Sequence, residues 1–248
     1  MNSTVSTNRT ALVTGGSRGI GAATALRLAR DGADVALTYV QDEEAAQDVV
    51  RKIEACGRRA VALRADSADP EAVPAAVHRT AETFGRLDIL VNNAGIGVLG
   101  PIDSLTTADV DRVLAVNVRA VFLACRAAAG VMERGGRIIS LGTALSRYAG
   151  GPGSTLYAMS KSALSGLTKP LARELGPRGI TVNLVQAGAV DTDLNPADGP
   201  YAAGQRAANA LDRFGTTGEV ASLIGYLVSD EAAYITGAEL VVDGGHAA

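Results

Sequence analysis

Short apolar runs and longer amphipathic stretches alternate along the chain from its start to its end. The short runs are rich in Val, Ile, Leu and Ala, and they predict seven β-strands, at residues 10–14, 34–39, 59–64, 87–91, 137–141, 180–185 and 239–242. The longer stretches predict helices at residues 22–30, 42–56, 106–132, 154–175 and 219–228; a further helix is expected to start at Asp69-Pro70, with Asp69 as its N-cap. Strands that alternate with helices predict an α/β fold, a doubly wound parallel sheet with helices on both faces.

No repeat, linker or change of composition interrupts this alternation, so the 248 residues are expected to form a single domain. The polar residues 1–9 are expected to be flexible. Residues 193–213 are rich in Ala, Pro, Gly and Asn and lack a strong period, which predicts a mobile lid over a substrate site.

Composition narrows the functional classes. Hydrophobic residues make up 47% of the chain and aromatic residues only 4%, which suits close packing of helices on a sheet. The net charge of −3, without a long basic or acidic run, argues against a nucleic-acid or membrane-surface partner. Cys56 and Cys125 lack the spacing of metal ligands, so no metal is expected. No apolar run reaches transmembrane length and no signal-peptide core is present, so the chain is expected to be cytoplasmic.

A glycine-rich turn, Thr-Gly-Gly-Ser-Arg-Gly-Ile-Gly at residues 14–21, lies between the first predicted strand and the first predicted helix. Glycines let a backbone approach phosphates, and the N–H groups at a helix N-terminus attract them, so this context predicts a dinucleotide site. An acid that binds the ribose 2′-OH would stand at the end of the second strand, but Tyr39 stands there, and Arg18 places a cation in the turn. Both features favour a 2′-phosphate, hence NADP(H) over NAD(H); the alternative is that Arg18 is only a solvated side chain.

Candidate proton-transfer chemistry lies in Tyr157-Ala-Met-Ser-Lys161. The phenol and the ammonium are four residues apart in a predicted helix and therefore share one face. A tyrosine has a pKa near ~10, and a nearby ammonium favours the phenolate and lowers that pKa. Taken alone the pair is weak evidence, because Tyr and Lys often fall four residues apart on a helix.

Amide side chains follow the fourth predicted strand, in Asn92-Asn93-Ala94-Gly95, and Asn117 lies inside the long helix predicted for residues 106–132. Amides at the C-terminal end of a strand can hold neighbouring strands and face a ligand crevice, although simple turn chemistry explains them equally well. A buried Asn in the middle of a helix needs a hydrogen-bond partner.

Taken together, these segments resemble the classical short-chain dehydrogenase/reductase family over essentially the whole chain. The glycine turn, Asn92 to Gly95, Asn117 and the Tyr157–Lys161 pair occur in the family's order and spacing, and Val242-Asp-Gly-Gly245 also fits. The resemblance implies a Rossmann fold and an NAD(P)(H)-dependent oxidoreductase that reduces a ketone to an alcohol. The alternatives are a 3-oxoacyl thioester reductase, a non-catalytic redox sensor that binds a dinucleotide, and a lyase or dehalogenase, which the intact Lys161 and glycine turn disfavour.

The resemblance also implies roles for individual residues. Tyr157 would be the general acid of reduction, Lys161 would lower its pKa and hold the nicotinamide ribose, and Asn117 would hold a water that links Lys161 to solvent. The cofactor would be bound by Gly15, Ser17, Arg18, Gly19, Ile20, Gly21, Tyr39, Asp66, Ser67, Asn93, Ala94, Gly95, Tyr157, Lys161, Gly188, Val190 and Thr192. Such proteins usually form homotetramers, partly through the helix that carries the tyrosine.

Three positions depart from the family pattern. Thr143 stands where the family has the serine that polarises the carbonyl; Ser140 and Ser146 are the other hydroxyls nearby. Ala187 replaces a proline before Gly188, which is expected to loosen that turn. Pro170 interrupts the helix of Tyr157, and a proline inside a helix costs about 3 kcal/mol unless a kink accommodates it.

Overall fold

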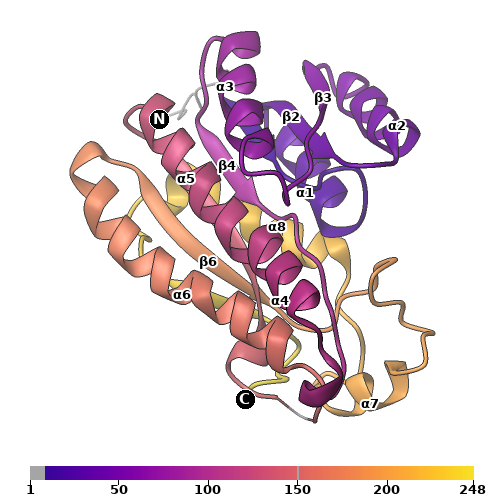
Figure 1. The fold of residues 1–248 in the computed structure, drawn as a ribbon. Helices are drawn as coiled ribbons and strands as arrows, with labels where there is room; N and C mark the ends of the chain where they lie inside the picture. Colours follow the sequence, from indigo (N-terminus) through magenta and orange to yellow (C-terminus); the bar gives the residue numbers. More distant parts are fainter. Residues whose placement is uncertain (1–8, 150) are drawn as a thin grey trace.

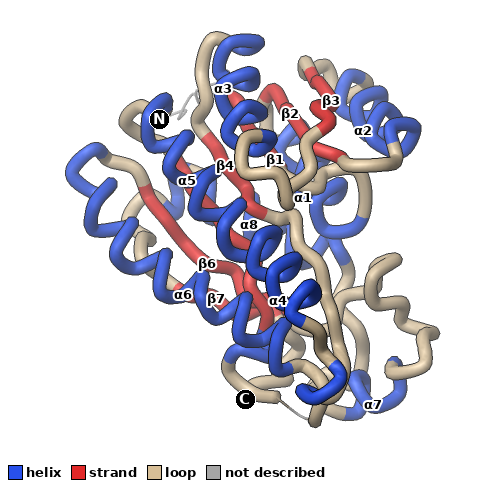
Figure 2. Tube along the Cα trace, viewed as in Figure 1, coloured by secondary structure: helices blue, strands red, loops and turns tan. Residues whose placement is uncertain are grey.

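The computed structural model describes residues 9–149 and 151–248, and its centre is one parallel sheet (Figures 1 and 2). The sheet has seven strands in the order β3-β2-β1-β4-β5-β6-β7. The strands are β1 (Thr10–Val13), β2 (Asp34–Tyr39), β3 (Ala60–Arg64), β4 (Ile89–Asn92), β5 (Arg137–Thr143), β6 (Thr181–Ala187) and β7 (Glu239–Val242). The predicted doubly wound Rossmann sheet is therefore confirmed, with each predicted strand end within two residues of the observed one.

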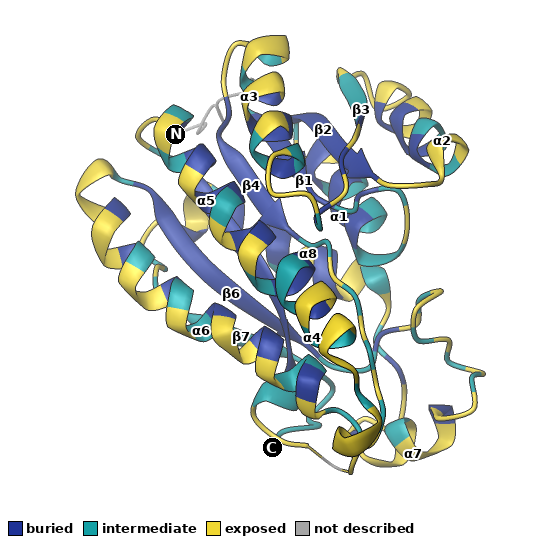
Figure 3. Cartoon of the chain, in the orientation of Figure 1, coloured by how far each residue is buried: buried dark blue, intermediate teal, exposed yellow. Residues whose placement is uncertain are grey.

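Helices cover both faces of the sheet, as Figure 3 shows by the buried strands between half-exposed helices. One apolar layer packs α1 (Gly19–Arg30), α2 (Glu43–Glu54) and α8 (Thr217–Val228) against the sheet. The other packs α3 (Ala72–Phe84), α5 (Ala120–Val131) and α6 (Thr155–Leu175) against the opposite face. Every residue of β1, β2, β4, β5 and β6 is buried, which explains why these strands are continuous apolar runs and not alternating ones.

The strand order reverses beside β1, which is where a parallel sheet of this kind forms a crevice. The chain leaves β1 towards β2 and β3, then returns to β4 on the other side of β1. Ligands of open α/β sheets bind at such a switch point, outside the carboxyl ends of the strands. The glycine turn follows β1 and the Asn-Asn-Ala-Gly segment follows β4, so both candidate cofactor segments lie at this crevice.

Two helix predictions need correction. The third helix begins at Ala72 with Glu71 as N-cap, and Asp69 instead accepts a hydrogen bond from the Glu71 N–H in a turn (2.9 Å). Pro170 does not interrupt α6, which runs on to Leu175 with the proline on its exposed surface.

The lid segment, residues 193–213, contains a helix that its composition did not predict, α7 (Ala202–Ala207). Two reciprocal amide hydrogen bonds between Asn195 and Gln205 (2.7 and 3.0 Å) fasten it to the start of the segment. Of the residues expected to be flexible, 1–8 lie outside the described residues, whereas Arg9 bonds to the Val228 carbonyl and pairs with Asp230.

A continuous helical stretch, Thr107–Val131, joins α4 (Thr107–Leu114), a π turn (Ala115–Arg119) and α5. By length and composition alone this 25-residue stretch could cross a membrane, so the expectation that no apolar stretch reaches this length was wrong. Ala124 and Ala128 on this stretch are fully buried in the core layer with α3 and α6, which is the environment of an internal helix.

Candidate active site

The backbone of the glycine turn after β1 leaves little room for side chains at its glycine positions. Gly15 and Gly19 have φ values of 63° and 56°. A Cβ on Gly21 would lie 2.2 Å from the Gly15 carbonyl oxygen, so the first turn of α1 packs directly on the loop. Thr38 of β2 holds the loop from below, because its hydroxyl accepts the Gly15 N–H (2.9 Å) and its carbonyl accepts the Gly16 N–H (2.9 Å).

The N-terminus of α1 is open to an anion. Its N-cap, Arg18, has an extended backbone and makes no side-chain capping bond, and no acidic residue lies in the first turn. The first N–H groups of a helix attract phosphate oxygens when no side chain caps them. The turn, including Ser17 and Ile20, therefore fits a pyrophosphate.

Asn93 joins the end of β4 to the glycine turn. Its side-chain amide donates to the carbonyls of Thr14 and Gly15 (both 2.9 Å). In return, the Thr14 hydroxyl accepts the main-chain N–H groups of Asn93 (3.0 Å) and Ala94 (3.1 Å). Asn93 thus joins the C-terminal ends of strands β1 and β4, which is more than a local turn interaction. The neighbouring Asn92 is buried and donates to Ser140 (3.3 Å).

Lys161 lies at the junction of three elements. It is 4% exposed on α6, and its Nζ donates to the Leu141 carbonyl of β5 (2.8 Å). A Cβ on Gly95, just after β4, would lie 3.0 Å from that Nζ. Tyr157 is half-buried four residues earlier on the same helix, and Gly97 passes near its ring. The structure therefore brings Tyr157, Lys161 and Gly95 together.

The pKa values differ from the expectation for a tyrosine beside an ammonium. Burial raises the pKa of Tyr157, and a hydrogen bond with Thr143 offsets part of that rise. Burial also lowers the pKa of Lys161 to about 8. The expected lowering of the Tyr157 pKa by Lys161 is thus not seen, because the ammonium bonds to the Leu141 carbonyl and desolvation dominates both groups.

Asn117 lies in the π turn between α4 and α5 and is fully buried. Its side-chain oxygen accepts the Ile96 N–H (2.9 Å), and its amide donates to the Ile96 carbonyl (2.9 Å) and to the Ser160 hydroxyl (3.0 Å). Ser160 in turn donates to the Tyr157 carbonyl (2.8 Å). Both amide hydrogens are in use, so a water at Asn117 would have to donate to a lone pair of this residue.

Three hydroxyls were candidates for a second donor at the substrate carbonyl. Ser140 is 2% exposed and accepts from Asn92, on the side of the sheet towards α5. The Ser146 hydroxyl is buried without a partner in the described part of the chain. Thr143 ends β5, accepts the Leu145 N–H (3.3 Å) and lies close enough to Tyr157 to lower the pKa of its phenol, so it is the one of the three hydroxyls that the structure associates with Tyr157.

The predicted adenosine contacts lie around the ends of β2 and β3. Tyr39 is buried at 8% exposure, and Ser67 is buried at 6%. Asp66 is exposed and accepts the Ala68 N–H in a turn (2.9 Å). The Arg18 side chain is 73% exposed and lies 4.0 Å from Asp193, the first residue of the lid segment.

The predicted carboxamide side follows β6. A Cβ on Gly188 would lie 2.6 Å from the Cα of Asp243, and its N–H donates to the Val242 carbonyl (3.0 Å), so the turn is closely held even without the proline. Val190 is buried and pairs with Gly215. Thr192 lies beside Gly19 of the glycine turn, because a Cβ on Gly19 would lie 3.5 Å from the Thr192 methyl group.

The comparisons with known proteins agree with this geometry. A family model described as enoyl-(acyl carrier protein) reductase matches residues 15–247. A short-chain dehydrogenase from Burkholderia cenocepacia J2315, solved in complex with NADP, is 56% identical with a TM-score of 0.97, over 98% of this chain and 99% of that one. The chain belongs to the short-chain dehydrogenase/reductase family. It is accordingly an NAD(P)-dependent oxidoreductase, as its motifs predicted.

Other members of the family are also similar. The cyclic-di-GMP-binding biofilm dispersal mediator protein of Escherichia coli K12 is 43% identical over 96% of this chain and 97% of that protein. The 3-oxoacyl-[acyl-carrier-protein] reductase FabG of Staphylococcus aureus is 39% identical over 96% of this chain and 97% of that protein.

Sequence reasoning missed several residues of this short-chain dehydrogenase/reductase site. Ser160 bonds to Asn117, and Thr38 holds the glycine turn. Arg64 ends β3 in register with Tyr39 of β2 and donates to the Val40 carbonyl (3.2 Å), so a second cation lies at the adenosine end. Only the position of Arg64 at the end of a predicted strand could have indicated it.

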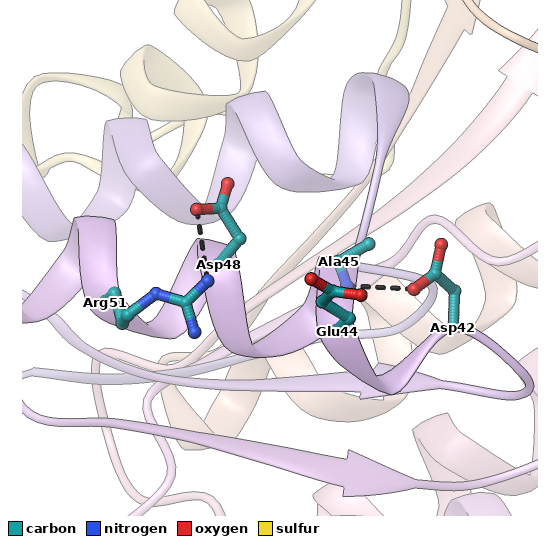
Figure 4. A pocket seen from close by; sticks show the side chains of 5 residues that line it. All are labelled: Asp42, Glu44, Ala45, Asp48 and Arg51. Atoms are coloured by element: carbon teal, nitrogen blue, oxygen red, sulfur yellow. Dashed lines mark hydrogen bonds and ion pairs between the residues drawn. The ribbon is translucent and has the colours of Figure 1, made fainter.

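A surface hollow lies away from the candidate site. It is beside α2, measures about 340 Å³ and is lined by Asp42, Glu44, Ala45, Asp48 and Arg51 (Figure 4). Asp42 caps α2 through the Ala45 N–H (2.9 Å), and Asp48 bonds to Arg51, so both aspartates already have helix-stabilising partners. Among residues 9–149 and 151–248, no group of three metal-binding side chains occurs.

Proposed function

We propose that this protein is an NADPH-dependent reductase that converts a ketone to an alcohol. The observation that carries the proposal is the buried Lys161 on the same face of α6 as Tyr157, between the ends of β4 and β5. A bound nicotinamide supplies the hydride in such a reaction.

Tyr157 would donate the proton to the carbonyl oxygen. Burial raises its pKa, so the phenol carries its proton at neutral pH, as a donor must. Thr143 would donate a second hydrogen bond to the same oxygen, where negative charge develops. Lys161 would hold the cofactor ribose, and Asn117 and Ser160 fix the part of α6 from which Tyr157 and Lys161 project.

The same proposal includes a preference for NADP(H). Arg18 and Arg64 are exposed cations near the end of β2, and Tyr39 stands there in place of an acid. Charge-assisted bonds to a 2′-phosphate are about twice as strong as neutral ones. Relatives solved with NADP or NADPH add support. Arg18→Ala should reduce the ratio of kcat/KM for NADPH to that for NADH, and a native protein that uses both cofactors equally would contradict the preference.

The experiment that tests the reductase function combines substrate screening with Tyr157→Phe. NADPH oxidation is followed with ketones, 3-oxoesters and imines, then repeated with the variant. The substitution removes one hydroxyl, so the NADPH dissociation constant should stay within about twofold while turnover falls about 10²-fold or more, as expected for loss of a general acid. Near-native turnover in the variant would exclude Tyr157 as the donor.

A 3-oxoacyl thioester reductase is the second candidate, favoured by the 39% identity to FabG. A 3-oxoacyl thioester in the same screen distinguishes it from a reductase of simple ketones. The intact Tyr157 and Lys161 favour catalysis over a role limited to dinucleotide binding.

We also infer that the protein is cytoplasmic, forms a homotetramer, has a single domain and uses residues 193–213 as its substrate lid. Phe122 on α5 is 54% exposed and Met159 on α6 is 51% exposed, so adjacent helices offer apolar side chains to another subunit. Light scattering after size exclusion tests the assembly, since a monomer would contradict it.

A further inference from the structure

The C-terminal tail, residues 243–248, is fastened to the far end of the lid segment. The Leu211 N–H donates to the Gly244 carbonyl (3.0 Å). A Cβ on Gly245 would lie 2.7 Å from the Cβ of Ala210, so these two backbones are in close contact. Asp243 shapes the tail itself, because its carboxylate accepts the N–H groups of Gly245 (2.9 Å) and Ala247 (3.0 Å).

The same tail contacts the loop between β5 and α6. The ring of His246 meets the ring of Tyr148 edge to face, with centroids 5.6 Å apart and planes at 67°. Aromatic pairs prefer this geometry at such a separation. The Nε2 atom of His246 is buried without a hydrogen-bond partner in the described part of the chain, so ring packing is the contact that sets the place of this imidazole. In Figure 1 the C-terminus lies at the same end of the molecule as α7 and the start of α6.

Tyr148 follows Thr143 by five residues in the sequence. Its N–H donates to the Ala144 carbonyl (3.1 Å), so it stands one helical turn beyond Ala144, the residue that follows Thr143. The side chain is 54% exposed even though one edge contacts His246. Tyr148 thus offers exposed aromatic surface on the segment that links Thr143 to α6, next to the tail that is fastened to the lid.

We propose that Tyr148 is a specificity-determining residue that packs against an apolar substituent of the carbonyl substrate, and that His246 is the residue that positions it. The inference rests on the proposed reductase function and names its substrate class: ketones with an aromatic or bulky alkyl group beside the carbonyl. His246 acts only through Tyr148, so it affects the binding of the large substituent and not the transfer of the proton.

The test uses two 3-oxoesters that differ in one group, ethyl 3-oxobutanoate with a methyl and ethyl 3-oxo-3-phenylpropanoate with a phenyl. His246→Ala should raise KM for the phenyl ester at least fivefold, with kcat and the KM for the methyl ester within twofold of native. His246→Phe keeps a ring edge against Tyr148 and should restore the phenyl KM to within twofold. Tyr148→Ala should raise the phenyl KM as much as His246→Ala, and the double variant should add little.

The chain contains only two histidines, which supplies a matched control. His78 is exposed on α3, so His78→Ala should leave all these values unchanged. A rise of KM for both esters together, or no rise for either, would overturn the inference, because His246 would then have a general structural role or none.

A second measurement separates this inference from the reductase function. If the native protein binds NADPH but reduces neither ester, the proposed reaction fails for these substrates and binding decides the inference. The His246 ring proton signals, assigned with His78→Ala, should shift when the phenyl ester is added to the NADPH complex and should stay in place with the methyl ester. No shift with the phenyl ester would overturn the role of the Tyr148–His246 pair.

Discussion

Lys161→Met should change the pH dependence of stability more than any other single substitution in the candidate site. Lys161 is 4% exposed, and burial lowers its pKa from 10.5 to about 8. A difference of that size between the unfolded and the folded pKa corresponds to about 3 kcal/mol of free energy of unfolding. Methionine has a similar volume and no charge to desolvate.

The sign follows from proton binding. Between pH 8 and 10.5 the unfolded chain binds a proton at Lys161 that the folded protein has already released. Stability therefore rises with pH across this window, and the full penalty of burying the ammonium is present below it. From pH 7 to 9.5 the native protein should gain about 2 kcal/mol relative to Lys161→Met. At pH 7 alone the difference is smaller, because the variant also loses the bond to the Leu141 carbonyl, a charged hydrogen bond worth about 1.5–3 kcal/mol.

Urea unfolding at pH 7.0 and 9.5 measures this difference for the native protein and the variant. Lys169→Met is the matched control, since Lys169 lies on the same helix with its side chain 66% exposed. The change that Lys169→Met makes in the free energy of unfolding should differ by less than about 0.5 kcal/mol between the two pH values, as for surface substitutions. If the free-energy difference between native protein and Lys161→Met is the same at both pH values, Lys161 is not desolvated and the explanation fails.

Three further substitutions test the site. Gly95→Ala places a methyl group 3.0 Å from the Lys161 Nζ, so kcat should fall at least tenfold with a melting temperature within a few degrees of native; unchanged kcat would show that Lys161 can move away. Thr143→Val should lower kcat tenfold or more, equivalent to about 1.4 kcal/mol of transition-state stabilisation; a normal Thr143→Val with an inactive Ser140→Ala would assign the role to Ser140. Asn93→Ala removes two hydrogen bonds to the glycine turn. The free energy of unfolding in urea should fall by about 1–3 kcal/mol, and NADPH binding should weaken in a fluorescence titration. Native values in both measurements would show that the turn keeps its conformation without Asn93.

The sheet was predictable because its five inner strands are buried on both faces. Such strands carry no alternation, and the apolar runs alone locate them, as for β2, whose predicted and observed bounds agree. The glycine turn was predictable for a similar reason, since positive φ values at Gly15 and Gly19 restrict the residue type.

Contacts between distant segments were not predictable from local patterns. Arg64 joins the adenosine end only because β3 pairs with β2, and Ser160 joins the candidate site only because α6 packs on the π turn at Asn117. The helix α7 was missed because side-chain amide bonds from Asn195 support it, and its six residues have little helical pattern of their own. Likewise, the pKa of Tyr157 depends on burial, which spacing along a helix does not report.

The position of Lys161 explains why the site depends on the whole sheet. Its ammonium bonds to β5 and lies beside Gly95, just after β4, and its own helix is held to Asn117 through Ser160. Each of these elements is placed by the apolar layer between the sheet and α3, α5 and α6, so none can shift without moving the ammonium. A buried charge is tolerated only where its surroundings are fixed and polar groups meet it. The core layer therefore does more than stabilise the fold, because it holds a desolvated lysine beside a half-buried tyrosine.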